Sequence, residues 1–235
     1  MQRDGGAYFR LLADIHDVFV RGEDSINPQP QSLGGLFLGA THGSYLAAAN
    51  LALSLHVVDA YKPLRGCLES AVYALHVERD PAAYTRWKER PIISALSDTA
   101  NVRQEQLRLR KKIGREFSVS NILSEIADVT LRARVDRLYD ETIDYGAHYN
   151  FPAFRHHFEI VDADNQEIRA VILTGKESEF VFCFKKIAEV ALTSLAILNL
   201  AYGTQWDQQI IASKIAGLTR AMQKRHPKQL RRRKS

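Results

Sequence analysis

The sequence predicts a mainly α-helical protein, a bundle of helices around a central apolar helix at about residues 177–202. Along most of the chain, apolar residues recur three and four positions apart, the spacing of one helix face. The run VALTSLAILNLAY, residues 190–202, is apolar on most sides and suits a helix buried in the middle of the bundle. The pattern becomes strand-like only at about residues 154–174. There FRHHFEIV and EIRAVILT flank the turn-forming DADNQ and predict one inserted β-hairpin.

The first part of the chain contains three predicted helices. Apolar spacing gives a helix over residues 8–20, followed by a loop at 25–32 that contains two prolines. A long helix is expected from about residue 33 to 56, with four glycines diluting its start. The third helix, 59–78, ends at the Asp-Pro pair of the segment RDP.

The second part of the chain continues in helices. Residues 81–96 predict two short helices separated by Pro91. The further helices are expected at 101–115, 118–128, 129–145 and 207–224, of which the first is strongly charged and the last is amphipathic. The basic run within 101–115 is interpreted as a solvated helix face.

The chain of 235 residues is long enough for one well-buried core, and we expect a single domain over residues 1–223. The segment KRHPKQLRRRKS, residues 224–235, is strongly basic, whereas the rest of the chain carries 25 basic and 27 acidic residues. We expect this basic tail to be disordered or a frayed helix end. Weak, salt-sensitive contact with RNA or DNA would use its cations, among them Lys224, Arg225, Arg231, Arg232, Arg233 and Lys234.

Composition favours a reduced, cytoplasmic protein. The two cysteines, Cys67 and Cys183, lie in apolar stretches without Cys-x-x-Cys spacing, which argues against a disulfide scaffold or a zinc ribbon. The opening residues MQRDGGAYFR contain no apolar segment of a signal peptide. The most apolar run is thirteen residues long, too short to span a bilayer, so we expect no membrane association.

A polar stripe follows one side of the predicted helix 59–78. Arg65, Glu69, Tyr73 and His76 are spaced four, four and three residues apart, and Arg65 can pair with Glu69 at i,i+4. The stripe either lines the surface or faces inward toward the helix end that carries His148. An inward ion pair would need several hydrogen-bonding partners, because a lone buried charge is costly.

The segment ETIDYGAHYN, residues 141–150, contains the second set of candidates. Asp144 and His148 are four residues apart, so a continuing helix would let Asp144 orient His148 or raise its pKa. Gly146 indicates that the helix ends nearby. His148 is then a general acid or base, or a structural residue that satisfies loop carbonyls. We expect Arg65, Glu69 and His148 to share hydrogen bonds directly or through one intervening group.

Signatures of metal and cofactor chemistry are missing from the sequence. It has no Glu-x-x-His pair of a di-iron bundle, no His-Glu-x-x-His of a zinc hydrolase and no phosphate-binding glycine loop. His156 and His157 are adjacent on a predicted strand and point to opposite faces, so they cannot converge on one metal. We expect neither a metal nor a cofactor.

Two segments carry a resemblance to a known class. AYKPLRGCLESAVYALHVERDPAAYTRWKER, residues 60–90, followed by YDETIDYGAHYN, residues 139–150, resembles uncharacterised bacterial proteins of the HEPN-like class. The similarity covers about residues 33 to 202. It implies an α-helical bundle and a homodimer, and in several branches of the class a ribonuclease toxin or an antiviral defence effector.

The HEPN ribonucleases resemble one another in an arginine followed, after four to six residues, by a histidine. No arginine stands at that distance before His148. The pairs Arg10–His16 and Arg220–His226 have the spacing, but apolar residues follow both arginines where a polar one is usual. The ribonuclease motif is therefore not supported by the sequence.

Two functions follow as hypotheses. The first is a non-catalytic binding or sensing module, a homodimer linked to bacterial stress or phage defence and able to bind a protein partner. In it, Arg65, Glu69 and His148 form an internal network that the fold needs. The alternative is a metal-independent, toxin-type endoribonuclease with a degenerate HEPN site, in which the same three residues open to solvent at a subunit groove next to basic residues. Asp144 is the fourth candidate residue of this polar cluster. An enzyme acting on a small molecule is a third, less specific option.

Overall fold

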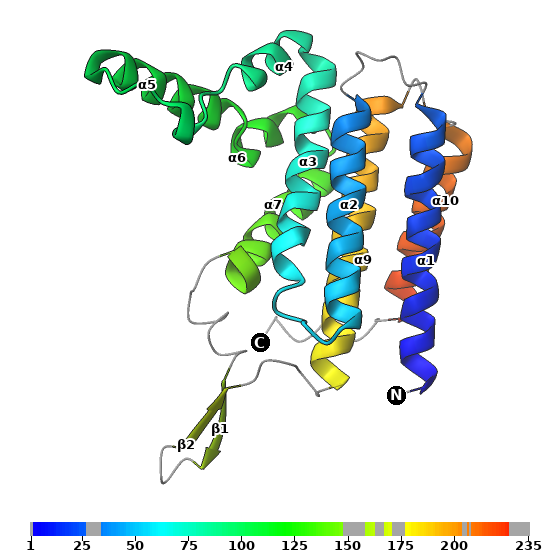
Figure 1. Cartoon of the computed structure of the whole chain (residues 1–235). Helices are drawn as coiled ribbons and strands as arrows, with labels where there is room; N and C mark the ends of the chain where they lie inside the picture. Colours follow the sequence, from blue (N-terminus) through cyan, green and yellow to red (C-terminus); the bar gives the residue numbers. More distant parts are fainter. Residues whose placement is uncertain are drawn as a thin grey trace.

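The structure is a computed structural model that describes residues 2–26, 34–147, 158–162, 167–170, 177–203, 206 and 208–225. The chain forms a helical bundle, which confirms the mainly α-helical class (Figure 1). The long helices are α1 (Gln2–Ser25), α2 (Gly34–Leu53), α3 (Tyr61–Arg79), α9 (Glu177–Tyr202) and α10 (Gln208–Arg225).

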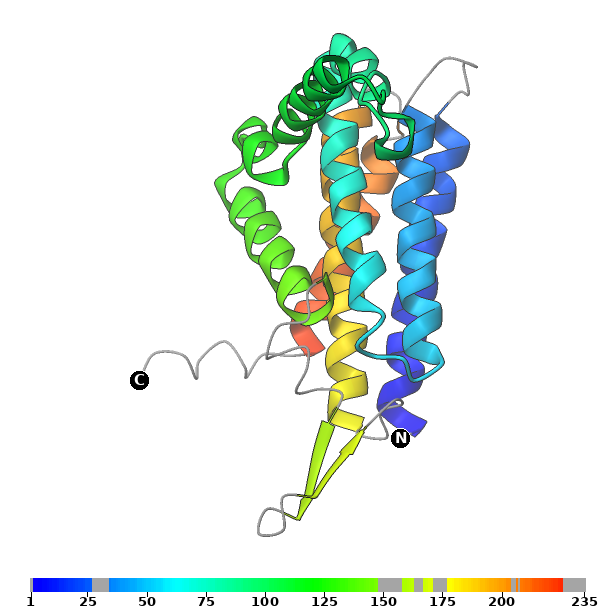
Figure 2. The same ribbon diagram turned by 60° about the vertical axis from the view of Figure 1, so that its left-hand side comes forward.

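Helix α9 is the central helix of the bundle, as its apolar sequence predicts. It contacts α1, α2, α3 and α10, and Figures 1 and 2 show it behind the layer formed by α3, α2 and α1. Ile187, Ala188, Ala191, Leu195 and Leu198 of α9 are almost completely buried. The core of the bundle therefore lies along this helix.

The shorter elements follow α3 at one end of the bundle and return along its side. They are α4 (Pro81–Lys88), η1 (Ile93–Ala95), α5 (Ala100–Glu116), α6 (Val119–Ile122), η2 (Leu123–Glu125) and α7 (Val129–Thr142). Asp80 caps α4 by accepting a hydrogen bond from the Ala82 amide, and Asp128 caps α7 by accepting from the amides of Thr130 and Leu131. These caps explain why both helices begin where they do.

Helix α2 ends three residues earlier than its sequence pattern predicts. Leu55 adopts a left-handed backbone conformation, with φ of 67°. The amide of Leu55 donates to the Ala52 carbonyl and the amide of His56 donates to the Leu51 carbonyl, which closes the last turn. A leucine rarely takes this conformation, so its side chain gives no sequence signal for the helix end.

Two short antiparallel strands lie within the region for which a hairpin was expected. They are β1 (Phe158–Asp162) and β2 (Glu167–Ala170), with Ile160 opposite Ile168 and an irregular register beyond Ile160. Of the predicted turn DADNQ, residues 162–166, Asp162 ends β1, and residues 163–166 lie outside the described residues. The described candidate residues, Arg65, Glu69 and Asp144, all lie in the helical bundle and not in these strands.

The basic tail is described only at its start. Lys224 and Arg225 belong to the last turn of α10. The remaining residues, 226–235, which include Arg231, Arg232, Arg233 and Lys234, lie outside the described part, so the expected disorder and nucleic-acid contact of the tail stay predictions. Among the described helices, none combines the length and the apolar character needed to cross a bilayer.

Candidate functional site

Arg65 and Glu69 form the ion pair that their spacing predicts. Both lie on α3, and the Arg65 Nε donates a hydrogen bond of 2.9 Å to the Glu69 Oε1. Their side chains are 30% and 24% exposed, so the pair lies at the edge of the bundle and is neither fully solvated nor fully buried. The pair is thus half-buried, and whether the stripe meets the helix end that carries His148 stays a prediction.

Tyr139 on α7 completes this pair. Its hydroxyl donates to the Glu69 Oε1 at 3.1 Å and lies 3.2 Å from the Arg65 Nη2, which donates to it. The Arg65 guanidinium also lies over the Tyr139 ring, 5.4 Å from its centroid. Burial and the neighbouring Glu69 carboxylate raise the pKa of Tyr139, so its hydroxyl stays protonated and able to donate. The three side chains tie α3 to α7.

The other two predicted site residues follow α7 in the chain. Asp144 lies in η3 (Ile143–Ala147), a turn of π-helix that continues from α7. π-Helical turns are rare and occur frequently at functional sites. His148 is the next residue after this turn and lies outside the described residues. The predicted hydrogen bonding of His148 with Arg65 and Glu69 therefore stays a prediction.

The π-helical turn packs closely against the start of α3. A Cβ atom on Gly146 would lie 2.5 Å from the Tyr61 Cβ and 2.9 Å from the Lys62 amide nitrogen. The rings of Tyr61 and Tyr145 lie in contact, with a centroid distance of 5.4 Å and a tilt of 35° between their planes. Gly146 thus allows the close packing of two helix ends, in addition to ending a helix as the sequence indicated.

His76, the last residue of the stripe, belongs to a different cluster. Its Nδ1 lies 2.6 Å from the Glu125 Oε1, and its Nε2 lies 3.5 Å from the Glu116 Oε1. The Arg86 guanidinium binds Glu116 at 2.7 Å and Asp80 at 2.6 Å. The hydrogen bond from Arg86 lowers the pKa of Glu116 and keeps its carboxylate ionised. This cluster joins α3, α4, α5 and η2.

A third polar cluster was not predicted. The His42 Nδ1 lies 2.9 Å from the Glu23 Oε1, and the His42 Nε2 lies 2.8 Å from the His16 Nδ1. When the His42 Nδ1–H donates to the Glu23 carboxylate, the His42 Nε2 accepts a hydrogen bond from the His16 Nδ1–H, and the His16 Nε2 then carries a lone pair. His42 is buried under the stacked ring of Phe19. This Glu–His–His chain can orient His16 as a proton acceptor.

A buried lysine forms the fourth cluster. Lys186 on α9 is almost fully buried, and its Nζ donates to the Glu141 Oε2 at 2.5 Å and to the Glu189 Oε2 at 3.1 Å. Arg137 also pairs with both glutamates. Burial alone would raise the pKa of Glu189, but Lys186 and Arg137 lower it overall. The cluster ties α7 to α9.

Neither cysteine is placed for nucleophilic chemistry. Cys67 and Cys183 are both buried and unpaired. Burial raises the pKa of each thiol to about 12, so the reactive thiolate is scarce at neutral pH. Over the described ranges, no three His, Cys, Asp or Glu side chains lie close enough together to hold a metal ion.

The most unusual surface of the bundle is the exposed face of α2. Its exposed residues are all uncharged: Gly35, Leu36, Gly39, Ala40, Gly43, Leu46, Ala47, Asn50 and Leu53. The leucines at 36, 46 and 53 are 63%, 42% and 47% exposed. Figure 1 shows α2 at the front of the bundle, between α3 and α1. The sequence did not predict this face, because apolar residues lie on more than one side of α2.

Comparison of the chain with protein-family models, curated proteins and solved structures found no match. The likeness to the HEPN-like class rests on the two sequence segments alone.

Proposed function

We propose that the chain is a non-catalytic, helical binding module that forms a homodimer through the exposed face of α2. The observation that carries this proposal is the absence of charge from that face. Helix α2 has 20 residues, about 30 Å of helix, and exposes only glycine, alanine, leucine and asparagine side chains. Exposed faces of helices in water are normally charged, and large uncharged patches mark interaction surfaces.

A second copy is the partner that fits this face. Gly35, Gly39 and Gly43 are four residues apart, and a Cβ added at any of them would meet open space. Small residues in one row let a second helix come close, and the exposed leucines can then pack over it. A two-fold axis presents the same patch on both subunits, so an uncharged face meets another uncharged face. Flanking surfaces of α1 and α3 would supply the rest of an interface of standard size.

The polar clusters support a structural role for two of the candidate residues, Arg65 and Glu69. Arg65 and Glu69 are both engaged with Tyr139 across α3 and α7. The His76 and Lys186 clusters join helices in the same way. In this account the clusters fix the shape of the module, and binding occurs on its helical surfaces. A role in bacterial stress or phage defence is what the HEPN-like resemblance adds to the proposal.

Sedimentation equilibrium tests the proposed dimer. The wild-type chain should sediment as a dimer, whereas Gly43→Glu should sediment as a monomer with unchanged helical content, because the added side chain enters open space in the monomer. Gly217→Glu is the matched control, since Gly217 on α10 also has open space around its Cα. A monomeric wild-type chain, or a Gly43→Glu variant that stays dimeric, contradicts the proposal.

One observation favours the alternative, a metal-independent endoribonuclease. Arg65 and Glu69 remain partly exposed beside α7, the helix whose π-helical continuation leads to His148. Asp144 and His148 would then act in proton transfer, which typically contributes about 10²–10⁴-fold to a rate. The test compares RNA degradation by the wild type and by a folded His148→Ala variant in the absence of metal. Degradation that only the wild type carries out supports this alternative, and equal degradation by the two proteins contradicts it.

A further inference from the structure

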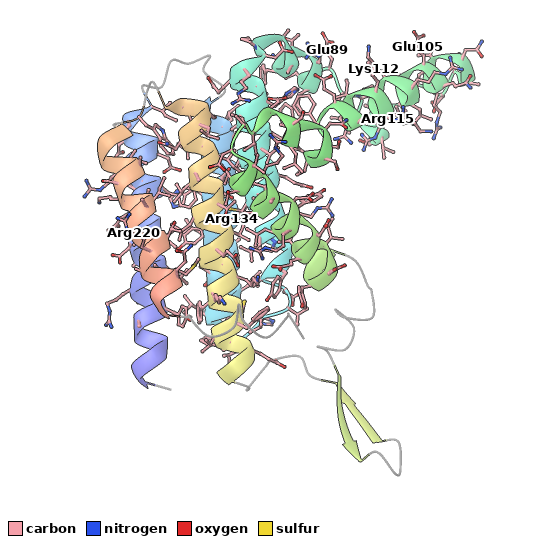
Figure 3. The ribbon with its side chains drawn as sticks, turned by 180° about the vertical axis from the view of Figure 1, so that it is seen from behind. Glu89, Glu105, Lys112, Arg115, Arg134 and Arg220 are labelled. Carbon is pink, nitrogen blue, oxygen red and sulfur yellow. The ribbon has the colours of Figure 1, made fainter. Side chains whose placement is uncertain are left out.

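Helix α5 projects from the bundle as an arm. Figures 1 and 3 show it at the end of the bundle, reaching away from the long helices. It is anchored at its C-terminal end, where Ile113 is buried and Glu116 binds Arg86. The Arg110 Nη1 donates to the Pro91 carbonyl at 2.8 Å, and the Gln106 Oε1 accepts from the Ser97 amide at 2.8 Å. The helix is thus held in place while most of its surface faces solvent.

One edge of the arm is apolar and exposed. Val102, Leu109 and Ile113 recur at intervals of seven and four residues on one side of α5. Ile113 is covered at the base of the arm, but Val102 and Leu109 are exposed toward its tip. Ile92 and Ile93 lie in the segment held along α5, and they are 67% and 61% exposed. The apolar edge of the helix therefore extends beyond what the bundle covers.

The rest of the arm is strongly basic. Helix α5 carries six Lys or Arg and two Glu, and one of these glutamates, Glu116, is already paired. Within the described part of the chain, no carboxylate pairs with the side chains of Arg103, Arg108, Lys111, Lys112 and Arg115. Figure 3 shows Lys112 and Arg115 on this helix, away from the body of the bundle. The arm presents positive charge together with exposed apolar side chains.

We propose that this arm docks an acidic segment of a partner protein, a segment that carries apolar side chains among its carboxylates. The proposal rests on the proposed function as a binding module and names a second surface of it. The partner's carboxylates pair with Arg108, Lys111 and Lys112, while its apolar side chains cover Val102 and Leu109. Charge complementarity steers the encounter, and the apolar contacts hold the complex.

The chemistry of the arm distinguishes this partner from three others. A nucleic-acid backbone would use the cations and leave Val102, Leu109 and the two isoleucines in water. A bilayer surface requires a broad apolar face on one side of a helix, whereas Leu107, also exposed on α5, lies on a different side from Val102 and Leu109. A second copy of the arm would place its own five unpaired cations beside these five, and the like charges would repel. An acidic protein segment matches both the charge and the apolar edge.

The test is selection of a random displayed-peptide library on the intact protein, followed by binding measurements by fluorescence anisotropy. Selected peptides should combine Asp or Glu with Leu, Ile or Phe. Their affinity should fall at least about tenfold for Arg108→Glu/Lys112→Glu and for Val102→Ser/Leu109→Ser. The matched control is Arg21→Glu/Arg220→Glu, a charge reversal on α1 and α10, which should bind as the wild type does. Figure 3 shows Arg220 on α10, away from the arm.

Several results would overturn the proposal. They are failure to enrich any peptide, enrichment of peptides without acidic residues, and undiminished binding by the arm variants. A single-stranded RNA oligonucleotide and phosphatidylserine vesicles are tested in the same way. If the arm binds either of them more tightly than it binds the peptides, that ligand replaces the acidic protein segment as the partner of the arm. Sedimentation of the same arm variants should still give the dimer. A Gly43→Glu protein that is monomeric but still binds the peptides would show that dimerisation through α2 and docking on α5 are independent.

Discussion

Gly146 packs against Tyr61 so closely that a Cβ atom at residue 146 would lie 2.5 Å from the Tyr61 Cβ. Real Cβ atoms do not approach this closely, so any side chain at 146 must push η3 away from the start of α3. We expect Gly146→Ala to lower the free energy of unfolding by about 1–3 kcal/mol, the usual range for overpacking.

Urea unfolding followed by circular dichroism checks this prediction. Gly217→Ala is the control, because the space around Gly217 is open. In a helix interior, alanine is more favourable than glycine by about 1 kcal/mol. The control should therefore be as stable as the wild type or more so. A Gly146→Ala protein with wild-type stability would show that the turn adjusts without cost.

The Tyr139 hydroxyl is hydrogen-bonded to both Arg65 and Glu69, so the loss of stability on removing it should depend on whether Glu69 is present. We expect Tyr139→Phe to cost about 1 kcal/mol, the net value of a typical hydrogen bond. In the double variant with Glu69→Gln, the two losses should not add, and the coupling should be about 0.5–1.5 kcal/mol. Denaturant unfolding of the four proteins measures this cycle. Strict additivity would mean that the network does not link α3 to α7.

Stability should fall with acid in part through Glu116. Its pKa is below the ordinary value of 4.5 because Arg86 donates to the carboxylate, so the folded state binds its proton less readily than the unfolded state does. The stabilisation is present above about pH 4.5 and is lost as the pH falls through the lower, folded pKa. Unfolding midpoints measured against pH should have a shallower acid slope for Glu116→Gln. Identical slopes would exclude a contribution from Glu116.

The thiols of Cys67 and Cys183 should be protected in the folded protein. Both are buried, and burial raises the pKa of each to about 12. A chromogenic disulfide reagent at neutral pH should react with them only as fast as the chain unfolds, and at once in denaturant. Fast reaction under native conditions would mean that one of the helices around them opens easily.

The parts of the structure that the sequence predicts are those set by local spacing. Helix α9 follows from its own apolar run, and the Arg65–Glu69 pair follows from a separation of four residues on one helix. Tyr139 joins that pair across 70 residues or more of chain, and no periodicity indicates which side chain of α7 will meet α3. Local spacing therefore predicts the ion pair but not the tyrosine that joins it.

The hydrogen-bonded histidines and the exposed face of α2 could not be predicted either, because both depend on how distant parts of the chain pack together. His16 and His42 are 26 residues apart and meet only because α1 packs against α2. The apolar residues of α2 lie on more than one side of the helix, and a single sequence does not tell which of those sides the bundle covers. Which surface is left open is a property of the assembled bundle.

The central claim is that two copies meet through α2, and spin labels test it most directly. A label on Ala47→Cys should attach selectively, since Cys67 and Cys183 are buried and unreactive. Pulsed electron resonance should then give a short, well-defined distance between labels, because packed helices lie about 8–10 Å apart. A label on Gly217→Cys, in α10 on the other side of the bundle, should give a clearly longer distance. Absence of any coupling between labels on α2, or a longer distance there than on α10, would contradict the account.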